Sequence, residues 1–119
     1  MKRPQYDFEK LEVYQRAIEF SEKIFTMTEQ FPSHVQYSLG DQLRRAALSI
    51  CNNMAEGSGK RGLAKRQFYG YSIDSARECV PMLEIAHRRQ FIDRVNYELL
   101  DGLCFRITSM LYALLRASN

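Results

Sequence analysis

One segment of the chain contains residue types that could bind a phosphate group, Gly57-Ser58-Gly59-Lys60. A phosphate-binding loop needs a glycine five residues before its Gly-Lys pair and Ser or Thr directly after the lysine. Met54 and Arg61 occupy those two positions, and a helical pattern rather than a strand precedes the segment. The sequence therefore argues against nucleotide hydrolysis.

Metal and nucleophile chemistry is also poorly supported by the residue pattern. A di-iron bundle needs Glu-x-x-His on two helices, and Glu84-Ile85-Ala86-His87 has no second copy, while His34 stands alone. The three cysteines, at positions 51, 79 and 104, form no CxxC pair, so neither a zinc site nor a disulfide framework is expected. No serine, threonine or cysteine has a recognisable base partner. We expect no catalytic residues, no metal and no cofactor.

A basic segment is the strongest functional lead. Net charge is only +3, but between residues 42 and 73 six Lys and Arg stand against the single acid Glu56. Such clusters neutralise phosphates, and the nearby Tyr69 and Tyr71 could stack on bases. The alternative is an ordinary solvated turn. The nucleic-acid hypothesis assigns binding to Arg44, Lys60, Arg61, Lys65 and Arg66.

A polar stripe lies beside the apolar face of the helix predicted before this segment. Its members step by three or four residues, which places them on one line of a helix. One interpretation is a recognition surface. The other is a structural polar seam, in which the stripe bonds to residues of the following helix because buried polar groups need partners. The residues concerned are Arg45, Ser49, Asn53 and Glu56, with Ser75 and Glu78 opposite.

The elements that position these residues are helices. Apolar residues recur every three or four positions in four segments, and none alternates with period two, which predicts an all-α fold. Short connections favour an antiparallel up-down-up-down four-helix bundle in a single domain, 1–119. Asp93 is a predicted N-cap, and Pro81 should bend a helix. The predicted helices span about 8–30, 36–57, 63–89 and 93–117.

Bulk properties suggest where such a chain resides. No run of eighteen apolar residues occurs, and the charged start of the chain is followed by no apolar signal stretch. We therefore expect a cytoplasmic protein.

The last predicted helix carries two apolar stripes that together cover roughly 160° of its circumference, more than the ~100° that a surface helix needs. Either the helix is central, or part of the face is used for self-association. We expect the second, with an oligomer face formed by Leu100, Cys104, Leu111 and Leu115.

The segment from Gln42 to Gly57 resembles the signature of the bacterial four helix bundle protein family, also called the ribosomal-RNA intervening-sequence protein family. That signature is Q-L-R-R-A-x-x-S-I-x-x-N-I-A-E-G, and Cys51 and Met54 depart from the usual proline and isoleucine. Phe8-Glu9-Lys10-Leu11, Phe31-Pro32 and Ser75-Ala76-Arg77-Glu78 agree as well, so the resemblance covers nearly the whole chain.

The resemblance implies an antiparallel bundle without enzymatic activity. The family is similar to the accessory variability protein of diversity-generating retroelements, a pentamer that binds nucleic acid and a reverse transcriptase. The resemblance thus implies a homo-oligomeric ring, such as a pentamer, with RNA or DNA or a protein such as a reverse transcriptase as partner. Our leading hypothesis is a non-enzymatic homo-oligomeric adaptor that binds nucleic acid. The alternative is a protein–protein interaction scaffold with no nucleic-acid role.

Overall fold

Four α-helices account for most of the computed structural model, which describes residues 3–118. The bounds of the four helices lie within two residues of the predicted ones except at the starts of the first and second. The extended backbone of Leu11 (ψ 131°) separates a short 3-10 turn from the first helix proper, and a π-helical turn at residues 36–40 precedes the second. The elements are η1 (Asp7–Lys10), α1 (Glu12–Thr28), η2 (Ser33–Val35), the π-helical turn η3 (Gln36–Gly40), α2 (Asp41–Ser58), α3 (Gly62–Arg88) and α4 (Arg94–Ala117).

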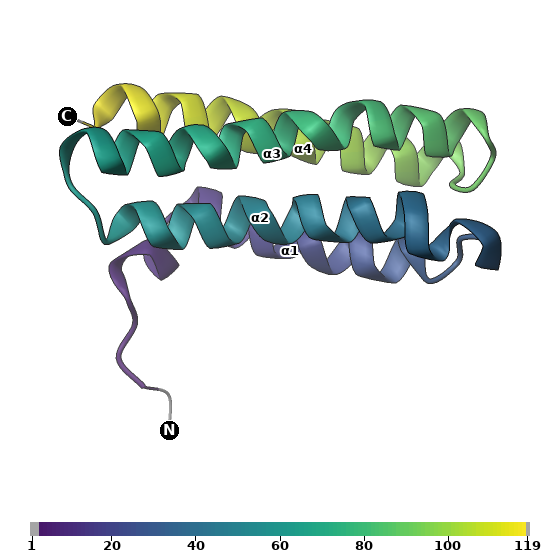
Figure 1. Ribbon diagram of the computed structural model, residues 1–119, viewed down its shortest axis with the longest axis horizontal. Coiled ribbons are helices and arrows are strands. Elements are labelled where there is room, and N and C mark those ends of the chain that lie inside the picture. Colours follow the sequence, from purple (N-terminus) through teal and green to yellow (C-terminus); the bar gives the residue numbers. More distant parts are fainter. Residues whose placement is uncertain (1–2, 119) are drawn as a thin grey trace.

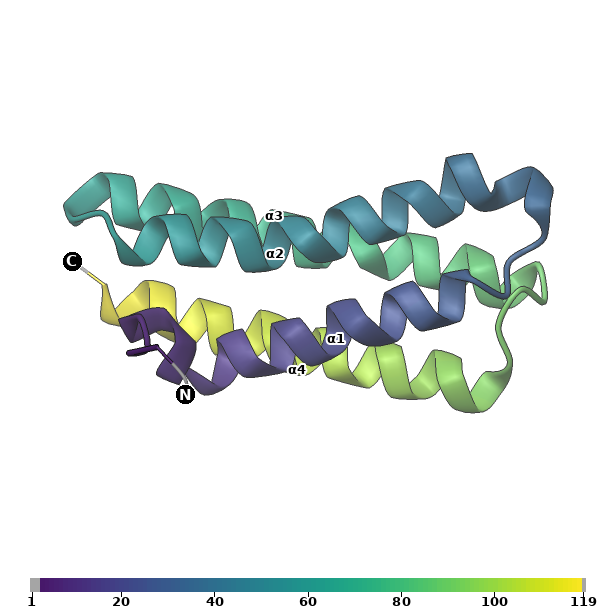
Figure 2. The same cartoon turned by 90° about the horizontal axis from the view of Figure 1, so that it is seen from below.

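The helices run alternately in opposite directions and form two layers (Figure 1). Contacts join α1 to α2, α2 to α3, α3 to α4 and α4 back to α1, so the cross-section is a square with one helix at each corner. In Figure 2, seen from below, α2 lies in line with α3, and α1 lies in line with α4. The all-α bundle predicted from the sequence is confirmed. Within residues 3–118, no helix is both long and apolar enough to cross a membrane.

The wide apolar arc of α4 is covered by the chain itself. Leu100, Cys104 and Leu111 are fully or almost fully buried, and Leu115 is half-buried. The prediction that these residues form an oligomer face is therefore wrong. A corner helix of a square bundle packs against two neighbours at once, here α1 and α3, and this requires a broader apolar arc than one neighbour would.

Two local predictions on helix geometry have clear outcomes. Asp93 is the N-cap of α4, because its Oδ1 accepts a 2.8 Å hydrogen bond from the Asn96 backbone N–H. Pro81 lies inside α3, which runs unbroken from Gly62 to Arg88 as one helix. Proline has no backbone N–H, so the carbonyl of Arg77 lacks its usual helical donor. Pro81 is exposed, and solvent can reach this side of the helix.

Candidate nucleic-acid interface

Small polar side chains hold α2 and α3 together at mid-length. Ser75 Oγ is 2.8 Å from Ser49 Oγ, and Asn53 Nδ2 donates to both the hydroxyl and the carbonyl oxygen of Ser49, each at 2.9 Å. One turn earlier in α3, Ser72 Oγ donates to the Ile50 carbonyl at 2.8 Å. We call Ser49, Asn53 and Ser75 the polar seam. Its hydrogen-bonding groups satisfy one another, as burial requires.

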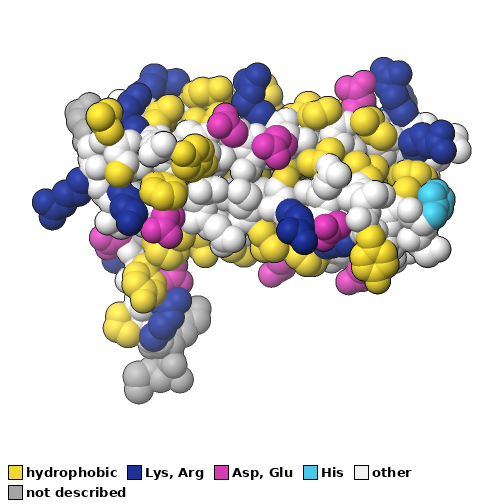
Figure 3. Space-filling model, viewed as in Figure 1, with side chains coloured by type: hydrophobic (Ala, Val, Ile, Leu, Met, Phe, Trp, Pro, Cys, Tyr) yellow, Lys and Arg dark blue, Asp and Glu magenta, His cyan; other side chains and the backbone are white. Residues whose placement is uncertain are grey.

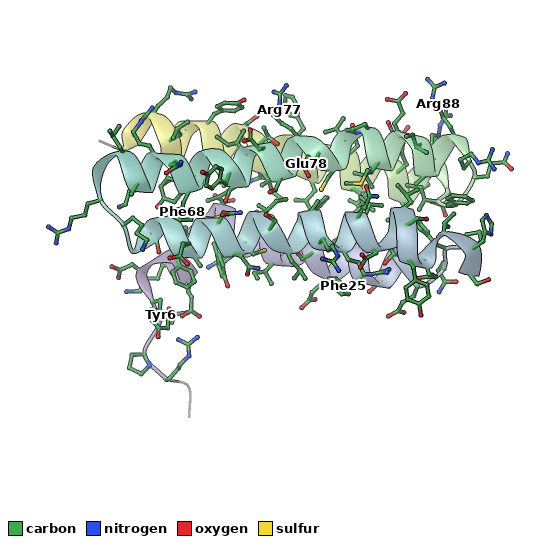
Figure 4. The ribbon with its side chains drawn as sticks, viewed as in Figure 1. Tyr6, Phe25, Phe68, Arg77, Glu78 and Arg88 are labelled. Carbon is green, nitrogen blue, oxygen red and sulfur yellow. The ribbon has the colours of Figure 1, made fainter. Side chains whose placement is uncertain are left out.

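Three residues predicted for this seam lie outside it. The Arg45 side chain is 79% exposed and pairs with Asp41 of its own helix at 2.8 Å. Glu56 pairs with Lys60 at 3.4 Å, and Glu78 projects from the exposed side of α3 (Figure 4). The polar stripe is wider than the contact between the helices, so its edges reach solvent. The small residues of the predicted seam therefore bond to one another, whereas the charged ones do not take part.

The two helices approach most closely where α2 ends. A Cβ at Gly57 would lie 2.9 Å from the Tyr69 ring and 3.0 Å from Phe68 Cβ, so only glycine fits without a shift. Tyr69 is buried by this contact, and burial raises the pKa of its phenol. Tyr69 is therefore not the stacking face that the sequence suggested. Tyr71 remains exposed, and Gln67 Nε2 donates to its hydroxyl at 2.7 Å.

A short glycine-containing turn connects these helices. Backbone N–H groups of Gly59 and Lys60 bond to the carbonyls of Glu56 and Gly57, which closes the end of α2. Gly62 then begins α3 with φ +57°, a conformation that favours glycine. We call the cationic stretch at residues 60–66 the basic turn. This turn lies at the left end of the bundle in Figure 1, and dark blue side chains are visible at that end in Figure 3.

The cations of the basic turn differ in their ion-pair and hydrogen-bond partners. Lys60 is 3.4 Å from Glu56, and its Nζ lies 5.9 Å from the Phe68 ring centre. Among residues 3–118, no carboxylate is within ion-pair distance of Arg61 or Lys65, and no side-chain hydrogen bond engages either. Arg61 and Lys65 are therefore available to an external anion.

Arg66 has a structural partner instead. Its Nη1 donates to the Leu115 carbonyl at 2.6 Å and to the Ser118 carbonyl at 2.9 Å. The last carbonyls of a helix have no intrahelical donor, so this guanidinium caps the end of α4. Arg66 lies in the predicted cluster, but two of its hydrogen bonds go to the chain itself.

Arg44 does not belong to the basic turn. Its guanidinium donates to the Gln36 carbonyl at 2.8 Å and to Gln36 Oε1 at 3.3 Å, which ties η3 to α2. The fourteen residues from Arg45 to Ser58 continue α2 beyond Arg44, a rise of about 21 Å before the turn begins. The prediction that Arg44 shares one binding patch with the turn is therefore wrong, because most of the length of α2 lies between them.

A comparison with known proteins assigns this four-helix chain to a protein family. A family model described as 23S rRNA-intervening sequence protein matches residues 9–113 of the 119. The chain belongs to that family. No curated protein matches the chain.

A solved structure supports the fold of this intervening-sequence family member. It is a protein of unknown function from the S23 ribosomal protein family of Bacteroides thetaiotaomicron VPI-5482, and the alignment covers 88% of this chain and 99% of that one. The TM-score is 0.78 at 19% sequence identity. At this identity the likeness shows the fold alone.

One cation near the basic turn was missed by the sequence analysis. Arg116 is exposed in the last turn of α4, directly beside Leu115, whose carbonyl Arg66 caps. The antiparallel order of the helices brings the end of α4 to the start of α3. The predicted topology already implied this neighbourhood, although local charge counting along the sequence did not reveal it.

The start of α3 gives these cations an unfavourable setting. No side chain caps the helix N-terminus, and its first turn contains no acid. The N-terminal end of a helix carries partial positive charge, so cations there are destabilising. Lys65 lies in this first turn, and Arg66 directly follows it. An anion bound here would be favoured by the exposed N–H groups as well as by the side chains.

The potential metal ligands among the described residues do not cluster, and the cysteines are buried. Among residues 3–118, no three His, Cys, Asp or Glu side chains cluster closely enough to hold a metal ion. All three cysteines are free and buried. Burial raises the pKa of the Cys51 thiol, while a hydrogen bond to Cys104 and burial raise that of Cys79. A raised pKa disfavours the nucleophilic thiolate at these two positions. The hydrogen bond with Cys79 lowers the pKa of Cys104, whose buried Sγ donates to the Ala76 carbonyl at 3.2 Å.

Proposed function

We propose that this family member is a non-enzymatic homo-oligomeric adaptor that binds nucleic acid, RNA or DNA, through the basic turn. The observation that carries the proposal is the state of Arg61 and Lys65. Both project from the start of α3 without a carboxylate partner among the described residues. They oppose the helix dipole, so the stability of the fold does not account for them.

The surroundings of these cations suit a phosphate backbone with accessible bases. Lys60 and Arg116 lie at the same end of the bundle, and Arg66 connects that end to α4. Leu63 is 85% exposed on the first turn of α3, and the Tyr71 ring is partly exposed further along. The description of the family refers to ribosomal RNA, which agrees with a nucleic-acid partner.

Assembly would strengthen a site of this size. A few cations per copy neutralise only a few phosphates, which predicts weak binding by one chain. A ring, such as the pentamer that the family resemblance implies, repeats the patch around its axis. Several contacts on one strand then raise the overall affinity through effective concentration.

The test is the salt dependence of binding. Fluorescence anisotropy with a labelled single-stranded RNA and the matching DNA should show an affinity that falls as salt rises. The triple variant Lys60→Gln, Arg61→Gln, Lys65→Gln should lower the slope of log K against log salt by about 0.7 for each phosphate that the variant no longer neutralises.

A matched variant keeps this test specific. Arg88→Gln, Arg89→Gln, Arg94→Gln removes the same charge at the opposite end of the bundle and should leave the slope unchanged. Arg88 and Arg94 have only exposed partners, Glu84 and Glu98, so little stability is lost. The proposal fails if neither nucleic acid binds at low ionic strength, or if both triple variants change the slope equally.

A second candidate function is a protein–protein interaction scaffold without a nucleic-acid role. The observation in its favour is exposed apolar surface, above all Phe105 of α4, which is 74% exposed. One protein retained after nuclease treatment, together with no RNA or DNA affinity at low salt, would support it over the adaptor.

A further inference from the structure

A cavity of about 550 Å³ lies between the C-terminal half of α1 and the beginning of α4. Its floor is apolar, because Ile92 and Leu100 are buried and Met27 and Phe91 are partly buried against the core. Both segments lie at the end of the bundle opposite the basic turn (Figure 2). Cavities of this volume with an apolar floor accommodate small molecules. We call this the α1–α4 cavity.

Polar side chains around the cavity are not engaged by the rest of the described chain. Asp93 uses Oδ1 to accept the Asn96 backbone N–H and leaves Oδ2 without a partner among residues 3–118. Within the same residues, no ion pair and no side-chain hydrogen bond engages the functional groups of Lys23, Thr26, Gln30 and Asn96. The α1–α4 cavity therefore combines an apolar floor with a polar rim that carries both signs of charge.

The ammonium and the carboxylate of this rim lie at opposite ends of the cavity. Because α1 and α4 are antiparallel, the lining from Lys23 to Gln30 runs against the lining from Asp93 to Leu100. Each stretch advances by seven residues, a rise of about 10 Å. Lys23 is therefore at the end formed by Leu100, and Asp93 is at the end formed by Gln30. The hydroxyl and amide groups of the rim lie between these two charges.

Glu22 also contributes to the lining but does not neutralise Lys23. Adjacent residues of a helix point about 100° apart, and no ion pair joins these two side chains. Glu22 also lines a separate depression between α1 and α2. The Lys23 ammonium is thus available to an anionic group of a ligand.

We propose that the α1–α4 cavity binds a short peptide with free termini, about three residues long. The Lys23 ammonium holds the C-terminal carboxylate of the peptide, and Asp93 Oδ2 accepts from its N-terminal ammonium. An extended chain rises by about 3.3 Å per residue, so three residues span the roughly 10 Å between the two ends. A single amino acid cannot reach both, because its two charged groups share one carbon atom.

The middle of the cavity suits the rest of such a peptide. Peptide groups donate and accept hydrogen bonds, and the Asn96 amide and the Thr26 hydroxyl can do both as well. Apolar side chains of the peptide contact the floor at Met27 and Leu100, and their removal from water stabilises the complex. An apolar tripeptide therefore matches the cavity in length, in charge and in its apolar surface.

The test uses the tripeptide Leu-Ala-Leu with free termini as the probe. Isothermal titration calorimetry at low salt should show saturable binding. NMR chemical shift changes of backbone amides should concentrate in residues 22–30 and 91–100. The same peptide with an acetylated N-terminus or an amidated C-terminus should bind at least about tenfold more weakly, because each change removes one charge-assisted contact. Free leucine should be at least as weak as these modified peptides.

Two variants assign the ends of the peptide. Lys23→Gln should weaken binding of the free peptide at least about tenfold but leave the affinity for the C-amidated peptide unchanged, since the contact is already absent there. Asp93→Asn should weaken the free peptide by a similar factor and leave the N-acetylated peptide unchanged. Asparagine also caps helices, so α4 keeps its N-cap. Lys10→Gln and Asp74→Asn are the matched controls, because both residues are exposed and lie outside the cavity, and both should bind like the wild type.

The remaining outcomes decide the proposal. It is overturned if millimolar free peptide does not bind, if the free, acetylated and amidated peptides bind equally well, or if the shift changes lie in other parts of the bundle. The modified peptides test the same contacts on the unaltered chain, so the result does not depend on the folding of a variant. The triple variant of the basic turn should bind the peptide like the wild type, and RNA binding is measured separately, so either proposal can fail while the other stands.

Discussion

The polar seam and the basic turn are neighbours in sequence and use polar side chains in opposite ways. In the seam, Ser49, Asn53 and Ser75 bond to one another and leave little for solvent or a ligand. In the turn, Arg61 and Lys65 have no carboxylate partner among residues 3–118. The seam follows from the need to satisfy buried groups. The turn does not, and we therefore look there for function.

This contrast makes opposite forecasts for substitution. Changes in the seam should lower the free energy of unfolding and leave nucleic-acid affinity unchanged wherever the protein is folded. Changes in the basic turn should lower nucleic-acid affinity and leave the free energy of unfolding nearly unchanged. Any position that breaks this division would show that the two regions are coupled.

The largest expected effect is at Gly57, where the seam ends. Gly57→Ala should lower the free energy of unfolding by about 1–3 kcal/mol, because the new Cβ would meet the Tyr69 ring at 2.9 Å. Gly70→Ala is the control, since nothing lies within 4 Å of a Cβ there and alanine favours the helix by about 0.5–1 kcal/mol. Urea unfolding measures both, and equal effects would contradict the close approach of α2 and α3.

Within the seam, Ser75→Ala should lower the free energy of unfolding by about 1 kcal/mol. The change removes the hydrogen bond between the Ser75 and Ser49 hydroxyls. A double-mutant cycle with Ser49→Ala should give a non-additive coupling of at least about 0.5 kcal/mol. Ser109→Ala, an exposed serine of α4, should change stability by less than about 0.5 kcal/mol. Additive losses at Ser49 and Ser75 would mean that the seam is not one network.

The sequence predicts the polar seam better than it predicts the hydrogen-bond and ion-pair partners of the cations in the basic turn. Periodicity places Ser49 and Asn53 on one line of α2, and the close packing of two helices leaves small polar groups only one another to bond. It cannot show how wide the contact is. Arg45 and Glu78 were therefore assigned to the seam although they reach solvent.

Long-range geometry accounts for the other errors. The burial of Leu100, Cys104 and Leu111 depends on α4 having two neighbours, which no local pattern in α4 encodes. Arg44 and Lys60 belong to one basic stretch of sequence, but the rise of α2 separates them. Arg66 bonds to the end of α4, forty-nine residues away from it at Leu115. Only the assembled bundle shows which cations are already engaged.

Arg66 shares features of both regions. It belongs to the basic turn by its position in the sequence, but its guanidinium bonds to the end of α4 and so supports the fold. Arg66→Gln should lower the free energy of unfolding by about 1 kcal/mol or less, since it removes a charged donor from the Leu115 and Ser118 carbonyls at a helix end. Arg61→Gln should change the free energy of unfolding by less than about 0.5 kcal/mol. It should reduce RNA affinity more than Arg66→Gln does. Chemical unfolding ranks the two variants by stability, and fluorescence anisotropy ranks them by RNA affinity. The reverse ranking would move Arg66 into the binding surface and Arg61 out of it.

The smallest effect has the most informative sign. Lys65→Glu should raise the free energy of unfolding by about 0.3–1 kcal/mol at low salt, because an acid in the first turn of α3 suits the helix dipole. Arg89→Glu reverses the same charge at the other end of α3 and should lower stability by a similar amount. Both effects should shrink as salt rises. RNA affinity should fall only for Lys65→Glu. A functional site predicts a lysine that destabilises its own helix but strengthens nucleic-acid binding. If Lys65→Glu instead lowered both stability and affinity, the role of Lys65 would be structural.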